Sequence, residues 1–323
     1  MQRRTLLTLS GASLLTGGRA EAQGGWPDRP IRIVVTFSPG GAPDMLTRGL
    51  GDLLSPRLGQ QIVVELRQGA GGNLGAEFTA RARPDGHTLW TASTGPLAYH
   101  HMIYPNLPFD AEKDFTYIGG IASTPNIVVV RPGLGFRTLD DLIGHAHRHP
   151  GELRYGSSGV GTTQHLSGEL LALMAGIELV HVPYRGGAYV VQDLLGDRVD
   201  LTFGSATSIN LIREGKLTAV AVTGKERFPA LPEVPTVHEQ GVTGYEATAW
   251  YGLVGPAGIP EPIVGRLNTL ANEAFRDEGY RQRMEQMGLY FMPTTPEGFR
   301  GFVAAERRKW SDVIRRLPIA VKG

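Results

Sequence analysis

Apolar residues along the chain recur at two spacings, one typical of buried strands and the other of amphipathic helices. Residues 31–37 form a short apolar run that predicts a strand, and the apolar positions that follow recur at helical spacing up to Gly59. Residues 61–66 predict a second strand, a short helix runs to Arg83, and residues 87–92 predict a third strand. This βαβαβ opening predicts an α/β fold whose sheets are mostly parallel.

A second series of the same kind follows residues 126–131, which are apolar and β-branched. It predicts helices at 138–149, 163–175 and 188–195, and strands at 153–156, 178–182, 199–203 and 217–223. Residues 249–254 form one more apolar run, and the chain beyond it is predicted to be helical, with loose interruptions, to Arg316.

Length and order together predict two lobes. A chain of 323 residues with 41% apolar composition can bury a large core and exceeds the usual size of one small domain. The extended segments at about 126–130 and 248–254 are the expected crossings between the lobes. Lobe 1 is therefore predicted to comprise residues 23–125 and 248–323, and lobe 2 residues 126–247.

The first residues have the pattern of an export signal. Arg3 and Arg4 precede a modest apolar stretch, and Ala20-Glu21-Ala22 is a small-x-small cleavage pattern. We expect cleavage after Ala22, so that residues 1–22 are removed and a soluble protein is exported. The general secretory and twin-arginine routes both stay open. No later apolar run reaches the length of a membrane-spanning helix.

Charge and cysteine content narrow the class of function. The formal net charge is +1, and the predicted signal carries three arginines and one glutamate, so the mature chain is near −1. The mature chain therefore lacks the excess of basic residues that is typical of a nucleic-acid-binding protein. The absence of cysteine excludes disulfides, thiol catalysis and cysteine metal sites.

Glycine-rich stretches follow four of the predicted strands, at residues 38–41, 69–73, 156–163 and 184–187. Open parallel sheets bind ligands beyond the carboxyl ends of their strands, where helices begin. Helix starts offer unpaired N–H groups and a partial positive charge, so these loops suit a carboxylate or phosphate. Ordinary turn chemistry remains the alternative for any one loop.

Signatures of common enzymes are absent. The residue two positions after Ser158 is Val160, where a nucleophile elbow requires glycine. Neither Lys216 nor Lys225 is followed by the serine or threonine of a phosphate-binding P-loop, and residues 159–164 lack the third glycine of a dinucleotide fingerprint.

His145, His147 and His149 raise the possibility of a metal site. On a helix only His145 and His149 share a face, and no acidic residue completes a sensible set, so the preferred interpretation is solvated histidines at a helix C-terminus. No metal and no cofactor are expected.

Five further residues have two interpretations each. His165 could orient its loop, which we favour, or pack inward, and Asp44 could brace its loop or hold water or a ligand amine. Arg185 could pair with a ligand carboxylate or lie on the rim. Trp250 and Tyr251 could line a cleft or belong to the core.

Eight segments, in order, carry a family resemblance: "FSPGGAPD", "LGQQIVVELRQGAGGNLGAE", "RPDGHTLW", "LPFDAEKDF", "YGSSGVGTTQHLSGEL", "HVPYRGG", "AVTGKERFPALPEVPT" and "YGLVGPAGIP". From about Pro30 to Trp310 the chain resembles the periplasmic solute receptors of the tripartite tricarboxylate transporter system, the Bug family. The resemblance implies a two-lobed, hinged periplasmic binding protein of the type II-like fold. It also implies a monomer that closes over a small carboxylate and delivers it to membrane transporter subunits, without catalysis.

The resemblance also implies a set of ligand-binding residues. These are Phe37, Ser38, Gly40, Gly41 and Asp44 in one lobe and Ser157, Gly161, Thr162, His165 and Ser205 in the other. The same loops and strand ends extend the predicted set to Gly72, Asn73, Ser93, Thr94, Thr163, Tyr184 and Arg185. Gly41 is expected to adopt a positive φ and the Thr162 hydroxyl to meet the ligand. Two alternatives stay open: a ligand sensor for a signalling partner, and an enzyme acting on a small carboxylate.

Overall fold

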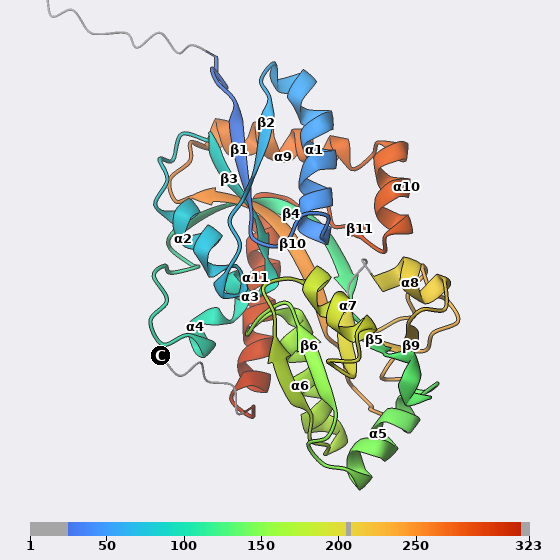
Figure 1. Cartoon of the computed structure of the whole chain (residues 1–323). Helices are drawn as coiled ribbons and strands as arrows, with labels where there is room; N and C mark the ends of the chain where they lie inside the picture. Colours follow the sequence, from blue (N-terminus) through green and yellow to red (C-terminus); the bar gives the residue numbers. More distant parts are fainter. Residues whose placement is uncertain (1–24, 205–207, 318–323) are drawn as a thin grey trace, which may run out of the picture.

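Two β-sheets, each flanked by helices, make up the protein in the computed structural model (Figure 1). The structure describes residues 25–204 and 208–317. The predicted export signal and Ser205 therefore lie outside the described residues. None of the helices in these two ranges is long and apolar enough to span a membrane.

The first sheet has six strands. In order across the sheet they are β11 (Tyr290–Phe291), β4 (Phe115–Pro125), β10 (Thr248–Pro256), β3 (Thr88–Ser93), β1 (Ile31–Val35) and β2 (Ile62–Leu66). β1 runs parallel to β2 and β3, whereas β10 runs antiparallel to both β3 and β4. β11 also pairs antiparallel with β4.

The second sheet has five strands. Their order is β7 (Val180–Pro183), β6 (Arg154–Ser157), β8 (Leu201–Gly204), β5 (Ile127–Val130) and β9 (Thr218–Val222). β6 is parallel to β7 and β8, and β5 is antiparallel to β8 and β9. The prediction of an α/β fold is confirmed, but the prediction of mostly parallel sheets is wrong. Both sheets are mixed, because the strands that connect them run against their neighbours.

Helices cover both faces of the first sheet. α1 (Ala42–Leu58), α9 (Glu261–Ala274) and α10 (Glu278–Gln286) pack on one face, and α2 (Asn73–Ala80), α3 (Thr94–Ala98), α4 (His100–Ile103) and α11 (Pro296–Ile314) lie on the other side (Figure 1). Alternate side chains of a strand point to opposite faces. Ile33 of β1 accordingly packs with Leu46 and Leu50 of α1, while Val34 joins the cluster that contains Trp310 of α11.

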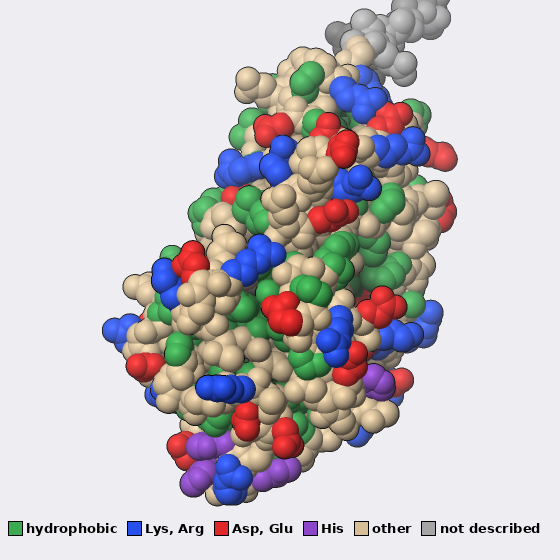
Figure 2. Space-filling model, turned by 90° about the vertical axis from the view of Figure 1, so that its right-hand side faces the viewer, with side chains coloured by type: hydrophobic (Ala, Val, Ile, Leu, Met, Phe, Trp, Pro, Cys, Tyr) green, Lys and Arg blue, Asp and Glu red, His purple; other side chains and the backbone are tan. Residues whose placement is uncertain are grey.

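The second sheet is flanked by the remaining helices, among which α6 and α7 contact its strands β6 and β8. They are α5 (Leu139–Arg148), α6 (Thr163–Ala175), α7 (Gly187–Leu195) and the short α8 (Ile209–Arg213). Two 3₁₀ turns, η1 (Ala70–Gly72) and η2 (Pro132–Leu134), complete the described elements. Figure 2 shows basic and acidic side chains interspersed over one face of the molecule.

The chain passes between the sheets twice, and a threonine ties the two passages together. Asn126 separates β4 from β5, and Ala247 directly precedes β10. The hydroxyl oxygen of Thr223 accepts the Asn126 N–H at 2.8 Å, and the hydroxyl donates to the Ala247 carbonyl at 2.5 Å. After β10 the chain stays with the first sheet, where α9 and α11 pack on β4.

Candidate ligand-binding site

Three helices begin at one cavity between the two sheets. Gly41 caps α1, Thr162 caps α6 and Gly186 caps α7, and residues of all three helix starts line the cavity. Each start follows a strand and a glycine-rich loop, as the sequence predicts. The cavity measures about 70 Å³, which suits a small organic ion better than a drug-sized molecule.

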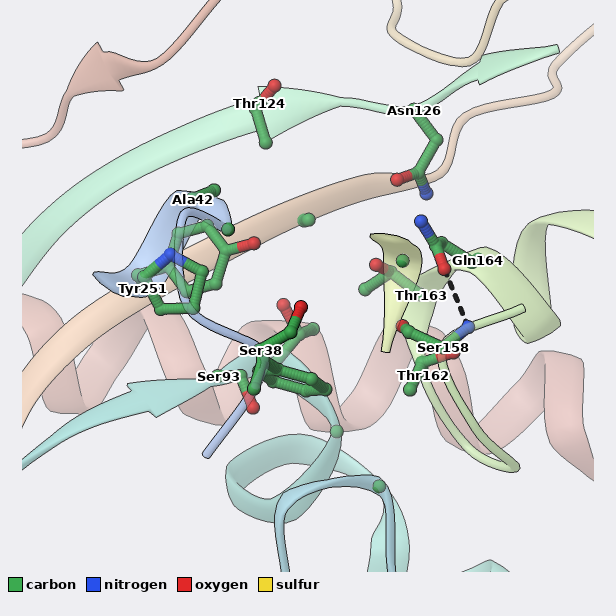
Figure 3. A pocket seen from close by; sticks show the side chains of 18 of the residues that line it. Ser38, Ala42, Ser93, Thr124, Asn126, Ser158, Thr162, Thr163, Gln164 and Tyr251 are labelled. Carbon is green, nitrogen blue, oxygen red and sulfur yellow. Dashed lines mark hydrogen bonds between the residues drawn. The ribbon is translucent and has the colours of Figure 1, made fainter. Parts of the chain in front are cut away.

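Neither an acidic nor a basic side chain is found among the described residues that line this cavity. The lining consists of Phe37, Ser38, Gly41, Ala42, Pro43, Gly71, Ser93, Thr94, Gly95, Thr124, Asn126, Ser158, Thr162, Thr163, Gln164, Gly187, Ala188, Ala249 and Tyr251. Figure 3 shows Ser38, Ser93 and Tyr251 on one side and Ser158, Thr162 and Thr163 on the other. The cavity thus offers hydroxyls, amides and helix N–H groups from both sheets.

The hydroxyls of Ser93 and Tyr251 lie at the cavity and can meet a ligand. Ser93 is buried, and its Oγ has no hydrogen-bond partner within the described residues. Burial raises the pKa of Tyr251 far above its ordinary value, so its hydroxyl remains a donor at neutral pH. An unpaired buried hydroxyl is costly, and a ligand oxygen that reaches Ser93 would remove that cost.

The loop before α1 is braced by Asp44. Its carboxylate accepts the Gly40 N–H at 2.9 Å and pairs with Arg48 Nε at 2.9 Å. This agrees with the interpretation of Asp44 as a brace. The expected positive φ belongs to Gly40, at +72°, and not to Gly41, whose φ is −73°. Gly41 instead allows a close approach, since a Cβ there would lie 3.1 Å from the Ser38 carbonyl oxygen.

The loop before α6 is held by Thr162 and His165. The Thr162 hydroxyl donates to the Gly159 carbonyl at 2.8 Å and accepts the His165 N–H at 3.4 Å, so Thr162 is the helix cap. His165 Nδ1 accepts the Gly161 N–H at 3.1 Å. Burial lowers the pKa of His165 to about 3, so the ring is neutral and can accept at Nδ1. The favoured loop-orienting role of His165 is confirmed, and the side chain is also buried.

His100 of α4 and Tyr104, which directly follows this helix, hold the same loop, and neither was predicted from the sequence. His100 Nε2 lies 2.9 Å from the Gly161 carbonyl oxygen, and the Tyr104 hydroxyl donates to the Val160 carbonyl at 2.9 Å. Burial lowers the pKa of His100 to about 3. The other ring nitrogen, His100 Nδ1, lies 2.5 Å from Asn73 Oδ1.

The predicted site residues divide into four groups. Phe37, Ser38, Gly41, Ser93, Thr94, Thr162 and Thr163 line the cavity. Gly72, Tyr184 and Arg185 line a neighbouring cavity of about 280 Å³. Gly40, Asp44, Asn73, Ser157, Gly161 and His165 lie behind the lining, where they hold the loops. Ser205 is outside the described residues.

Several lining residues were not predicted. Ser158 belongs to a loop that the sequence singles out, and Gln164 lies in the first turn of α6, where its side chain accepts the Ser158 N–H at 2.7 Å (Figure 3). Asn126 carries no local signal beyond its place at a predicted crossing, and Thr124 carries none. Of the two aromatic candidates, Tyr251 lines the cavity, whereas the buried Trp250 donates to Glu306 at 3.1 Å.

The chain is similar to a known protein family, to curated relatives and to solved structures. Residues 46–319 match the family model described as "Tripartite tricarboxylate transporter family receptor". BugT of Bordetella pertussis is 32% identical over 326 residues, which cover 100% of both chains. The structure of Rpa4515 from R. palustris with adipate has a TM-score of 0.89 at 35% identity, with 92% of this chain and 99% of that chain covered. MatC from Rhodopseudomonas palustris with bound malate has a TM-score of 0.84 at 31% identity, covering 90% and 100%.

Proposed function

The chain belongs to the receptor family of the tripartite tricarboxylate transporters, which includes the Bug periplasmic binding proteins, and from this premise we propose that it binds a linear dicarboxylate. Members of this family are solute-binding receptors and not enzymes. The proposed ligand lies in the cavity between the sheets, and the proposed destination is the membrane subunits of a tripartite transporter. A hinge at the two crossings, with lobes divided near residues 125 and 247, is part of the proposal.

The observation that carries the proposal is the convergence of three helix starts on a cavity whose described lining is uncharged. A helix start stabilises an anion by ~0.3–1 kcal/mol in exposed settings and by up to ~2 kcal/mol when partly buried. Because α1 belongs to the first sheet and α6 and α7 to the second, the two carboxylates of one ligand can each meet a helix start. Adipate and malate, named with two related structures, are dicarboxylates of this kind.

The proposal is tested by calorimetry on tag-free protein that has been freed of bound ligand. We expect malate, succinate and adipate to give measurable heats, with one of them clearly preferred. Adipamide, which has the length of adipate without its charge, is the matched control and should bind at least tenfold more weakly. Equal affinity for the amide and the acid, or no binding of any linear diacid, would contradict a dicarboxylate receptor.

Arg185 is expected to contribute little to affinity for the dicarboxylate. It is exposed, it lines the neighbouring cavity, and it is absent from the cavity at the helix starts. We expect Arg185→Gln to change the dissociation constant by less than about threefold. A loss of more than about tenfold would show that a formal ion pair, rather than the helix starts, holds the ligand.

Thr163→Val is expected to weaken binding by about 1–3 kcal/mol, because it removes a lining hydroxyl and leaves a buried ligand oxygen without a partner. Thr162→Val is a poorer probe, since Thr162 also caps α6 and its loss destabilises the helix by about 1 kcal/mol. Calorimetry with a parallel melting curve separates the two effects. Unchanged affinity in Thr163→Val would remove this hydroxyl from the site.

A further inference from the structure

Two histidines at the end of α5 form a cluster with a carboxylate that the sequence pattern did not predict. His145 and His149 share a face, as expected, with ring centroids 4.7 Å apart. The statement that no acidic residue completes the set is wrong, because Glu152 faces both rings. Glu152 Oε1 lies 3.6 Å from His145 Nε2, and Oε2 lies 3.4 Å from His149 Nδ1. His147 is not part of the cluster, since its Nε2 lies 3.2 Å from the Ala175 carbonyl oxygen.

A tight turn brings Glu152 back against the helix end. The turn starts at His149, has Pro150 in its second position and Gly151, with φ of +71°, in its third. The Glu152 N–H closes it by donating to the His149 carbonyl at 3.3 Å. Pro-Gly is a favoured pair for the two central positions of a type II turn, and the proline ring fixes φ at the first of them. The chain therefore holds the carboxylate beside the two imidazoles at low entropic cost.

The spacing of the donor atoms suits a transition metal. One ligand atom from each of the three residues lies within 4.8 Å of the other two. Two ligands at ~2.1 Å from a tetrahedral Zn²⁺ are ~3.4 Å apart, and each histidine nitrogen lies 3.4 or 3.6 Å from one of the two Glu152 carboxylate oxygens. His145 Nε2 is also buried without a hydrogen-bond partner among the described residues. Such an unpaired nitrogen is costly, and a metal ion would use its lone pair.

We propose that His145, His149 and Glu152 bind a divalent transition metal ion of the zinc class. Two imidazole nitrogens and one carboxylate match the three protein ligands of many zinc sites, with water in the fourth position. The site lies at the C-terminal end of α5, where the partial negative charge of the helix favours a cation. Figure 2 shows histidine side chains gathered at the lower end of the molecule, where Figure 1 places α5. The ion joins the end of α5 to the turn before β6, away from the ligand cavity.

The test uses calorimetry and melting curves on tag-free, chelator-treated protein, with ZnCl₂ as the probe and CaCl₂ as a comparison. We expect one Zn²⁺ to bind per chain and to raise the melting temperature, and Ca²⁺, which prefers oxygen ligands, to do neither. His149→Ala and Glu152→Gln should each weaken Zn²⁺ binding at least tenfold and abolish the thermal shift. His147→Ala, on the same helix but outside the cluster, should bind Zn²⁺ like the parent.

Each of two results would overturn the proposal. One is the absence of stoichiometric Zn²⁺ binding to the parent protein at micromolar concentrations. The other is parent-like Zn²⁺ affinity in the His149→Ala and Glu152→Gln variants, which would place any bound ion elsewhere. The three substituted residues are exposed, so each variant is expected to fold. The melting temperature of each variant without metal checks this.

Discussion

Gly71→Ala is expected to lower the affinity for the proposed dicarboxylate by about a hundredfold, which corresponds to ~2.7 kcal/mol. Gly71 belongs to the loop before α2, and a Cβ there would lie 2.6 Å from the Val160 carbonyl oxygen of the opposite loop. Backbone atoms cannot yield as a flexible side chain does, so the two loops must separate. A separated cleft leaves the ligand with helix starts from one sheet only.

The control for this variant is Gly176→Ala. Gly71 and Gly176 have the same φ of +64°, so both substitutions cost a similar backbone strain of ~1 kcal/mol. No atom lies within 4 Å of a Cβ at Gly176, which ends α6 on the side away from the cleft. Gly176→Ala should therefore lower the melting temperature without changing the affinity.

Small-angle scattering gives an independent measurement of the same variant. Ligand that stabilises a closed, hinged form should reduce the radius of gyration of the parent protein. The reduction should be smaller in Gly71→Ala than in Gly176→Ala. Parent-like affinity together with a parent-like reduction in Gly71→Ala would show that the two loops need not meet for binding.

The parts of the site that the sequence predicts are those with a local signal. An apolar run, a glycine-rich loop and a helical repeat occur together within about twenty residues at the starts of α1 and α6. Such neighbours along the chain predict the helix start and hence its N–H groups. That pattern places the cavity residues Ser38, Gly41, Thr162 and Thr163 at loops and helix starts, and the family resemblance implies the ligand-binding role of the first three.

The parts that were missed depend on contacts between distant segments. β4 went unpredicted because Gly119 and Gly120 interrupt its apolar pattern, yet a Cβ at Gly120 would lie 2.6 Å from the Met292 carbonyl oxygen. Met292 directly follows β11, a strand of two residues that is too short to show an alternation of apolar and polar residues. Strand direction is likewise a property of the pairing, so the antiparallel course of β5 and β10 could not be read from their apolar residues.

His100 shows the same limit at the site itself. It lies in α4, a helix of four residues that starts seven positions after the end of β3, and its partner Gly161 is 61 positions further along the chain. Nothing in its neighbourhood in the sequence distinguishes it from His101. The fold makes the difference, since His100 is completely buried and His101 is exposed.

Acid is expected to weaken ligand binding through His100. Burial lowers the pKa of His100 to about 3 when the side chain contacts Gly161 across the cleft. We expect opening of the cleft to return this pKa toward its ordinary value of ~6.5. A lowered pKa means that the contribution of His100 to closure is complete above pH ~6.5 and is lost as the pH falls toward 3. At pH ~5.5 the loss reaches ~1.4 kcal/mol, which is about a tenfold change in affinity.

His100→Gln isolates this contribution, because the glutamine amide can still donate to the Gly161 carbonyl but does not titrate. Burial also lowers the pKa of His165 to about 3 and that of His181 to about 4, so the variant should keep part of the acid response. We expect the ratio of dissociation constants at pH 5.5 and 7.5, measured by calorimetry, to be about tenfold smaller in His100→Gln than in the parent. His101→Gln, on the same helix without a bond across the cleft, should keep the parent's ratio. If His100→Gln and the parent respond equally to acid, His100 does not exchange protons on opening, and the clasp on Gly161 is a fixed part of the fold.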